Sequence, residues 1–441
     1  MPKKTLRFSE HQKWLFDRSY VTVEGQEVRL NTMPEHRLAI EKFHHQTKGT
    51  YFDLIHNGIC FKEQVGVLQI GQLVIEIVPK IDQSPLDQAQ WHDILLEMLK
   101  ECDFLQPESS GYAHLRFKTN SILELYFIKF ITELEGLLHS GLVKKYRIET
   151  GNSNALKGRL LFSRHLQKNQ FHPERFFTAR TIFDPHHLLH QILRQALTVI
   201  ATLNTVDVFR ERLQILLALW PDGKPVNISD KIFDRLVFIR SNSAYKEAVL
   251  MARMILLRYS PDLRAGANHI LALMFNMNTL WEEFIFRRLK SLENECGWKV
   301  SQKKEMFYWK GRRYKKLIPD IIISDELNKV NLIIDTKWKK PGNDQPDDHD
   351  LRQLLAYKIF FEANSAYLLY PTNGKHYITN GVFHNKSYGT NNPVFQPNLA
   401  LQGGLVFFNL VKDRKLISKV DFKKEFYALL FNDNTNEEVT S

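Results

Sequence analysis

Cysteine is scarce in this sequence, with three residues in a chain of 441. Cys60, Cys102 and Cys296 lie far apart, and no C-x-x-C pair occurs. Disulfide-rich secreted scaffolds and structural zinc sites both require cysteines in dense or closely spaced sets. The sequence therefore argues against both and favours a reducing compartment.

Long apolar runs are also missing. No stretch approaches the roughly 18 apolar residues of a membrane-spanning helix, and the N-terminal MPKKTLRFSEHQKW becomes polar too early for a signal peptide. We therefore expect a cytoplasmic protein without membrane association.

A nucleotide-binding loop of the form G-x-x-x-x-G-K-[ST] is absent as well. In P-loop NTPases this loop cradles the phosphates of the nucleotide. If this protein takes part in nucleotide-driven work, the hydrolysis has to come from another chain.

Positive charge is present in excess. The 60 lysines and arginines outnumber the 49 acidic residues, which gives a net charge of +11 and a pI near 9.3. This balance favours a polyanionic partner, because lysine and arginine contact phosphates and steer their approach.

The pattern of predicted elements changes along the chain, whose length allows two or three domains. Residues 1–115 are strand-rich, with alternation over Cys60–Ile81, and are typical of a recognition or docking module. Residues 116–264 show mainly helical periodicity. A third segment covers residues 265–441, and the whole chain is predicted to be an α+β multidomain protein.

One predicted helix of the middle segment begins at Asp184, with proline at the first helical position. His186, His187 and His190 follow, at a spacing that would allow a metal site. Carboxylate partners in a fixed frame are missing, so we interpret them as ordinary histidines of a helix start.

The most informative stretch is Gly311–Lys340, where two apolar β-type runs flank a polar turn. If Glu326–Lys329 form a four-residue hairpin loop, Asp320 and Asp335 lie directly opposite each other, with Cβ atoms roughly 4.5–5.5 Å apart. Lys337 points to the same face because side chains alternate along a strand.

Two opposed carboxylates repel each other unless a cation binds between them. Mg²⁺ takes oxygen ligands and usually one or two carboxylates, so Asp320 and Asp335 are the predicted metal ligands. The ion can polarise a phosphoryl oxygen and lower the pKa of a water, while the Lys337 ammonium stabilises developing negative charge.

A helix upstream of the hairpin carries a further candidate carboxylate. Asn278 is a plausible N-cap of the helix TLWEEFIFRRLKSLEN. Glu282 lies at the edge of the apolar face and needs a partner there, whereas Glu283 lies outside, beside Arg287. Glu282 is therefore a candidate catalytic residue, which would complete the metal shell or orient Lys337. The apolar face comprises Leu280, Trp281, Phe284, Ile285 and Leu289.

Cations interleaved with aromatic residues precede the motif, over residues 307–316. Such a surface can follow a nucleic-acid backbone and stack on bases. The predicted DNA-binding residues are Lys310, Arg312, Arg313, Lys315 and Lys316.

Pro319-Asp320, the hairpin, and Asp335-x-Lys337 together resemble the PD-(D/E)xK nucleases. Gln353 and Tyr357, four residues apart on one helix, resemble the Q-x-x-x-Y element of their RecB-like branch. This resemblance implies that Asp320, Asp335 and Lys337 are catalytic, that Gln353 and Tyr357 support the site, and that the third segment is an α/β nuclease domain with a central mixed sheet flanked by helices.

Further stretches resemble the McrC family, from about residue 60 to residue 370. The family has Asp where this chain has Asn276 and Phe where it has Trp281, and Thr336 and Trp338 also depart from its usual residues. The matching stretches are Gly66-Val67, Leu73–Ile81, Gly141-Leu142 with Tyr146, Leu156–Arg159 and Phe275–Glu282.

The resemblance implies a nuclease subunit of a two-component, modification-dependent restriction system of the McrBC type. Its partner would be a McrB-like AAA+ GTPase hexamer that binds GTP, with docking through residues 1–115, and its substrate DNA carrying modified cytosine. Two alternatives stay open: a non-catalytic adaptor that stimulates an AAA+ partner, and a RecB-like repair nuclease that acts on DNA ends.

Overall fold

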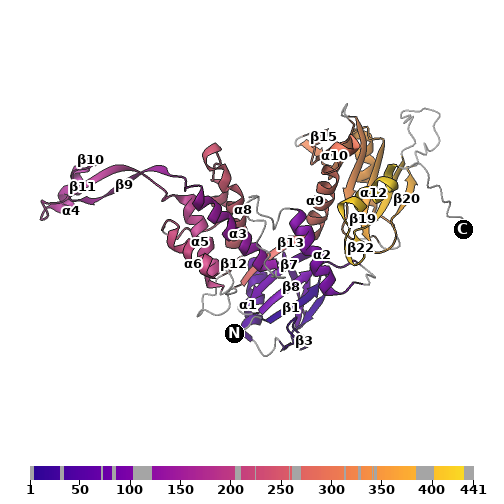
Figure 1. Cartoon of the computed structure of the whole chain (residues 1–441), viewed down its shortest axis with the longest axis horizontal. Helices are drawn as coiled ribbons and strands as arrows, with labels where there is room; N and C mark the ends of the chain where they lie inside the picture. Colours follow the sequence, from indigo (N-terminus) through magenta and orange to yellow (C-terminus); the bar gives the residue numbers. More distant parts are fainter. Residues whose placement is uncertain are drawn as a thin grey trace. The chain divides into compact units, whose positions relative to one another are not determined.

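The computed structural model of the chain describes residues 4–29, 34–70, 73–81, 86–102, 122–203, 210–223, 225–257, 259–260, 270–311, 314–325, 329–339, 341, 345–383 and 402–431 (Figure 1). The chain forms two compact units. Unit 1 comprises Met1–Leu68, Gln72–Gln106 and Met274–Ser441, and unit 2 comprises Gln69–Gly71 and Pro107–Leu273. The first and third segments predicted from the sequence thus contribute to one unit, and the mixed α+β character of the chain is as predicted.

The N-terminal part of unit 1 is built around a buried β-sheet. β1 (Lys4–Ser9) pairs in parallel with β8 (Leu73–Val78), and β8 lies beside β7 (Gln64–Ile70). All six residues of β8 are buried, so its alternating sequence is covered on both faces. α2 (Gln88–Glu101) packs on this sheet and begins with a capping box between Asp87 and Gln90. The remaining elements here are β2 (Lys13–Leu15), β3 (Ser19–Val21), β4 (Glu27–Arg29), α1 (Pro34–Gln46), β5 (Phe52–Ile55) and β6 (Gly58–Phe61).

The C-terminal part of unit 1 contains a mixed sheet of six strands, in the order β14-β17-β18-β19-β21-β20. The β18/β19 and β19/β21 pairs are parallel and the other pairs antiparallel. α9 and α11 pack against it. The strands are β14 (Lys299–Gln302), β17 (Ile321–Ser324), β18 (Val330–Thr336), β19 (Ser365–Thr372), β20 (Tyr377–Val382) and β21 (Gln402–Asn409), and the helices α9 (Met277–Lys290) and α11 (Asp348–Phe360).

One core of this sheet lies under α11. Ile322 and Ile333 pack there with Leu354 and Tyr357 of the helix. Because strand side chains alternate, Asp335 faces the same side as Ile333, toward α11. Also present in this part are α10 (Glu293–Cys296), β15 (Met306–Lys310), β16 (Tyr314–Leu317), β22 (Val411–Lys412), β23 (Lys415–Leu416) and α12 (Lys419–Phe431).

The predicted register of the β17–β18 hairpin is confirmed, although its tip differs. Ile321 pairs with Ile334, which is the alignment that sets Asp320 level with Asp335. Near the turn, Ser324 pairs with Val330 and the register shifts by one residue. The shift is a bulge that adds one residue to β18 between Val330 and Leu332.

Unit 2 combines helices with a long β-ribbon, so it is less purely helical than its periodicity predicts. β9 (Lys145–Ser153) and β11 (Phe176–Asp184) pair along their full lengths, and Figure 1 shows α4 (Phe162–Asn169) and β10 (Arg159–Leu160) at the far end of this ribbon. The helices are α3 (Ile122–His139), α5 (Leu188–Thr202), α6 (Arg210–Leu219), α7 (Asp230–Asp234), the 3₁₀ helix η3 (Arg240–Tyr245) and α8 (Lys246–Leu257). β12 (Tyr259–Ser260) precedes β13 (Ile270–Asn276), within which the chain passes back to unit 1.

Both predicted helix starts are wrong by a few residues. α5 begins at Leu188, because Asp184 is the last residue of β11 and pairs with Arg147 at 2.8 Å. α9 begins at Met277, because the side chain of Asn276 accepts hydrogen bonds from the N–H groups of Asn278 and Thr279 and is the N-cap.

Candidate active site

Asp335 and Lys337 lie at the C-terminal end of β18, on the side that faces α11. Asp335 is 3% exposed, and the Nζ atom of Lys337 lies 3.0 Å from its Oδ2 atom. The same Nζ lies 3.0 Å from Oδ1 of Asp350, in the first turn of α11. Lys337 therefore bridges two carboxylates from a strand and a helix.

Asp320 comes one residue before β17 and is held by the neighbouring strand. Its Oδ2 atom accepts hydrogen bonds from the Thr336 N–H at 2.7 Å and from the Thr336 hydroxyl at 2.9 Å. Thr336 thus lies between Asp335 and Lys337 in the sequence, and its hydroxyl holds the carboxylate of Asp320 in place.

The electrostatics of the site reflect crowded, buried negative charge. Burial and then the charge of Asp320 raise the pKa of Asp335 to about 6, against the opposing effect of Lys337. Burial also raises the pKa of Asp320, although its bonds to Thr336 counteract this. Burial alone would lower the pKa of Lys337, but Asp335 and Asp350 outweigh it and raise that pKa above its ordinary value. Lys337 therefore stays charged.

Glu282 lies close enough to Asp320 for the two charges to interact. Burial and then Asp320 raise the pKa of Glu282. Its Oε1 atom accepts a hydrogen bond from Gln302 at 3.0 Å and lies 3.7 Å from Nζ of Lys303. Glu283 instead pairs with Arg287 at 2.5 Å, as predicted for the outer side of the helix.

Gln353 and Tyr357 form one hydrogen-bonded pair on α11. The Gln353 amide donates to the Tyr357 hydroxyl at 2.5 Å, and this hydroxyl donates to the carbonyl of Ile318 at 2.9 Å. Burial and the charge of Asp335 raise the pKa of Tyr357. The pair therefore fixes the segment just before Asp320 and borders the carboxylate of Asp335.

The basic and aromatic residues form the two-stranded ribbon β15–β16, which leads directly into Asp320. The ribbon exposes Phe307, Trp309 and Tyr314, which are 57%, 61% and 57% exposed. Lys310, Lys315 and Lys316 are exposed on the same ribbon, with Lys316 over the ring of Phe307 at 5.1 Å. Arg312 and Arg313 lie outside the described residues.

The oxygen ligands of this site suit Mg²⁺, which usually takes one or two carboxylates and completes its shell with water and phosphate oxygens. Within the ranges given above, no three His, Cys, Asp or Glu side chains form a ready-made metal cluster. The protein would thus supply two ligands, Asp320 and Asp335. A bound cation would offset both the burial and the repulsion from Asp320 that raise the pKa of Asp335, so these residues fit the ion.

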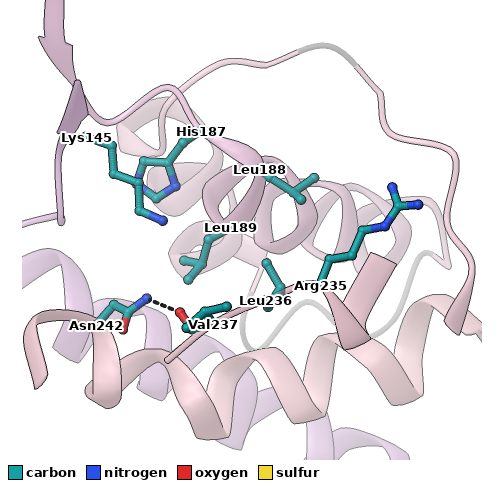
Figure 2. A pocket seen from close by; sticks show the side chains of 8 residues that line it. All are labelled: Lys145, His187, Leu188, Leu189, Arg235, Leu236, Val237 and Asn242. Carbon is teal, nitrogen blue, oxygen red and sulfur yellow. Dashed lines mark hydrogen bonds between the residues drawn. The ribbon is translucent and has the colours of Figure 1, made fainter. Parts of the chain in front are cut away.

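The histidines of unit 2 have structural partners, in agreement with their interpretation as helix-start residues. Burial lowers the pKa of His190 to about 4, and its ring bonds the carbonyl of Pro185 and the hydroxyl of Tyr245. His187 lines a cavity of about 260 Å³ beside Lys145, as Figure 2 shows. A lysine in this cavity disfavours a cation. The ring of His186 bonds the carbonyl of Asp222.

Two residues of the site were not identified from the sequence. In the sequence, Thr336 is visible only as a departure from the family pattern, and Asp350 ends a stretch rich in proline, glycine and acidic residues. An available signal for Asp350 was its place after the N-cap Asp347, which puts it in a helix first turn. No signal in the sequence pointed to the bond between Thr336 and Asp320.

A comparison with protein families matches residues 59–371 to the McrBC family, described as McrBC 5-methylcytosine restriction system component. The chain belongs to the McrBC family. A comparison with curated proteins finds no match. None of the helices described for this McrBC family member is long and apolar enough to cross a membrane.

Solved structures of related complexes resemble the chain. It superimposes with a TM-score of 0.61 and 16% identity, over 96% of this chain and 99% of the other, on a chain of a half-complex from a tetradecameric assembly of Thermococcus gammatolerans McrB AAA+ hexamers with bound McrC. A chain of the Thermococcus gammatolerans McrBC complex matches with a TM-score of 0.46 and 17% identity, over 65% of this chain and 87% of the other. The first likeness shows a shared fold over nearly the whole of both chains.

Proposed function

We propose that this chain is the Mg²⁺-dependent DNA endonuclease subunit of a two-component, GTP-dependent restriction system that acts on DNA with 5-methylcytosine-type modification. Membership of the McrBC family supports the restriction role. The observation that carries the nuclease assignment is the approach of Asp320, Asp335 and Lys337 to one another at the end of a single hairpin.

Each residue of the site has a defined task in phosphodiester hydrolysis. When bound, Mg²⁺ supplies Lewis-acid polarisation of the phosphoryl group and a more acidic water. Asp320 and Asp335 hold the ion, and Thr336 orients the carboxylate of Asp320. Lys337 offers a permanent positive charge to the oxygens on which negative charge grows, and Asp350 keeps its ammonium in place.

Glu282 and the pair on α11 complete the site. Glu282, whose pKa is raised by burial and then by the charge of Asp320, would help Asp320 and Asp335 to hold the ion. Gln353 and Tyr357 fix the backbone of Ile318, two residues before Asp320, and so set the position of this ligand.

The ribbon β15–β16 is the proposed DNA-binding surface. Lys310, Lys315 and Lys316 would contact phosphates, and the exposed ring of Trp309 would stack on a base. The ribbon and Asp320 belong to one continuous segment, so DNA held on the ribbon would be delivered beside the carboxylates.

An AAA+ GTPase hexamer is the proposed partner. The Thermococcus gammatolerans McrC that shares this fold is bound to McrB AAA+ hexamers, and no nucleotide-binding loop occurs in the present sequence. The partner would supply GTP hydrolysis and target recognition, and the present chain would supply cleavage.

The test is cleavage of modified and unmodified circular DNA by this chain together with a McrB-like partner, with and without GTP and Mg²⁺. Nicking or linearisation that requires all components supports the proposal. Stimulation of partner GTPase activity without metal-dependent cutting would indicate an adaptor, and cleavage restricted to linear DNA would indicate a nuclease acting on ends.

A further inference from the structure

Trp338, the residue after Lys337, is anchored by the N-terminal part of the chain. Its indole N–H donates to Oε1 of Glu10 at 2.7 Å, across 328 residues of sequence. Glu10 is 2% exposed and Trp338 is 4% exposed. A buried hydrogen bond of this kind is costly to break, because the indole N–H would then have neither its partner nor a water molecule to donate to.

Glu10 is itself fixed within the N-terminal sheet. Its N–H donates to the carbonyl of Val78, which continues the pairing of β1 with β8. The same Oε1 atom that accepts from Trp338 also accepts from the N–H of Lys80 at 2.8 Å. The carboxylate is thereby held by the segment that follows β8, in a position to accept the hydrogen bond from the indole.

A second connection reaches the same residue through α9. The N–H of Trp338 donates to Oδ1 of Asn278 at 3.2 Å, and the amide of Asn278 donates to Oε2 of Glu63 at 3.1 Å. The N–H of Met277 also donates to the carbonyl of Glu63 at 3.1 Å. Glu63 immediately precedes β7, so both ends of the Trp338 residue, backbone and ring, are tied to the N-terminal sheet.

Lys337 is held at the opposite side by the mixed sheet. Its N–H donates to the carbonyl of Leu369 in β19 at 2.9 Å, and this carbonyl also accepts from the indole of Trp281 at 3.3 Å. The Trp281 and Trp338 rings are in contact, with centroids 5.8 Å apart. The backbone that carries Lys337 is therefore clamped between β19 and the anchored Trp338.

We propose that Glu10 and Trp338 are positioning residues through which the N-terminal sheet holds Lys337 in its catalytic place. The inference rests on the proposed nuclease function. It gives the N-terminal sheet a second task besides the proposed docking, because any partner that shifts β1 or β8 would also shift the backbone beside Lys337. Cleavage would then depend on the integrity of the N-terminal sheet, with no contact between that sheet and the DNA.

The test compares Glu10→Ala, Glu10→Gln and Trp338→Phe in the full chain with its partner. Glu10→Ala removes the acceptor, Trp338→Phe removes the donor but keeps a ring, and Glu10→Gln keeps an acceptor oxygen. We expect the first two to slow DNA cleavage roughly 10- to 100-fold, as small misplacements of catalytic groups do. Glu10→Gln should retain most of the wild-type rate. The double variant that combines Glu10→Ala with Trp338→Phe should cleave no more slowly than either single variant.

Glu76→Gln is the matched control for disturbance of the N-terminal sheet. Glu76 is also 2% exposed and pairs with Arg7 at 2.8 Å inside that sheet. Glu76→Gln should destabilise the sheet without moving Lys337. Below its melting temperature, this variant should therefore cleave DNA at close to the wild-type rate.

Hydrogen–deuterium exchange of the peptide that contains Lys337 and Trp338 gives a readout independent of cleavage. Glu10→Ala should speed its exchange, and Glu76→Gln should not. If the wild type cleaves DNA while Glu10→Ala cleaves equally fast or shows unchanged exchange, the positioning role is refuted. If the wild type never cleaves but Glu10→Ala alters exchange at Lys337, the proposed function fails while the mechanical link stands.

Discussion

The carboxylate of Asp320 is held by both the N–H and the hydroxyl of Thr336, at 2.7 and 2.9 Å. Thr336 occupies the one position between Asp335 and Lys337. The side chain of Thr336 points to the face of the strand opposite to that of Asp335. It still reaches Asp320, because Asp320 precedes β17 and is not part of the strand pairing. The geometry of the site thus depends on a residue that carries no charge.

Thr336→Val should therefore impair cleavage although it keeps the size and shape of the side chain. The variant loses one hydrogen bond to a carboxylate, worth about 1.5–3 kcal/mol, so we expect cleavage to slow by roughly tenfold or more. Single-turnover cleavage rates over a range of Mg²⁺ concentrations measure the effect. Thr336→Ser keeps the hydroxyl and should retain most of the activity, whereas equal loss in both variants would contradict this role.

Asp335→Asn should make the protein more stable at alkaline pH. Because the pKa of Asp335 in the folded protein is raised to about 6, the folded state binds this proton more tightly than the unfolded state. The charged carboxylate therefore lowers the free energy of unfolding above pH 6, and the penalty fades as the pH falls through 6 toward 4. We expect a gain of order 1–3 kcal/mol for Asp335→Asn at pH 8 and little gain near pH 4.

Melting temperatures of the wild type and Asp335→Asn between pH 4 and pH 8 measure this difference. Added Mg²⁺ at pH 8 should stabilise the wild type and not the variant, since only a state that binds the ion gains from it. A variant that is less stable than the wild type at pH 8, or equally stabilised by Mg²⁺, would be incompatible with a strained carboxylate pair.

Tyr357→Phe and Gln353→Ala should have similar effects that do not add. Both changes break the chain of hydrogen bonds from Gln353 through Tyr357 to the carbonyl of Ile318. We expect each to reduce cleavage severalfold, at roughly 0.5–1.5 kcal/mol for a lost neutral hydrogen bond. The measurement is a double-mutant cycle on the cleavage rate, and fully additive losses would show that the two residues act separately.

Replacing Lys310, Lys315 and Lys316 with alanine should weaken binding to DNA of any sequence. If each lysine contacts one phosphate, the slope of log K against log salt should become shallower by about 2–3. Fluorescence anisotropy with a duplex, in EDTA to prevent cutting, measures the slope. The control variant replaces Lys412, Lys415 and Lys419, which are exposed elsewhere in unit 1, and an unchanged slope in the first variant would exclude the ribbon as the phosphate-binding surface.

The sequence was sufficient for features that depend on local periodicity. The alignment of Asp320 with Asp335 was predicted from the hairpin pattern, although the bulge near its tip was not, and the pair Gln353–Tyr357 follows from helical spacing. The buried face of α9 was predicted for the same reason, although its N-cap proved to be Asn276.

Features that depend on long-range packing could not be predicted. The bond between Glu10 and Trp338 joins residues 328 positions apart, and nothing in either local sequence marks them as partners. The proline, glycine and acidic residues before Asp350 favour a loop, yet helix α11 starts early enough to bring Asp350 to Lys337. The grouping of residues 1–68 and 72–106 with 274–441 likewise appears only once the sheets are packed.

The most direct measurement of the central claim is cleavage of closed circular, cytosine-methylated DNA by the wild type and by Asp335→Ala, each with a McrB-like partner, GTP and Mg²⁺. We expect the wild type to linearise the DNA only when Mg²⁺ is present. We expect Asp335→Ala to bind and stimulate the partner still but to produce no cut. Cleavage by Asp335→Ala at the wild-type rate, or by the wild type in excess EDTA, would rule out a metal-dependent site at Asp335.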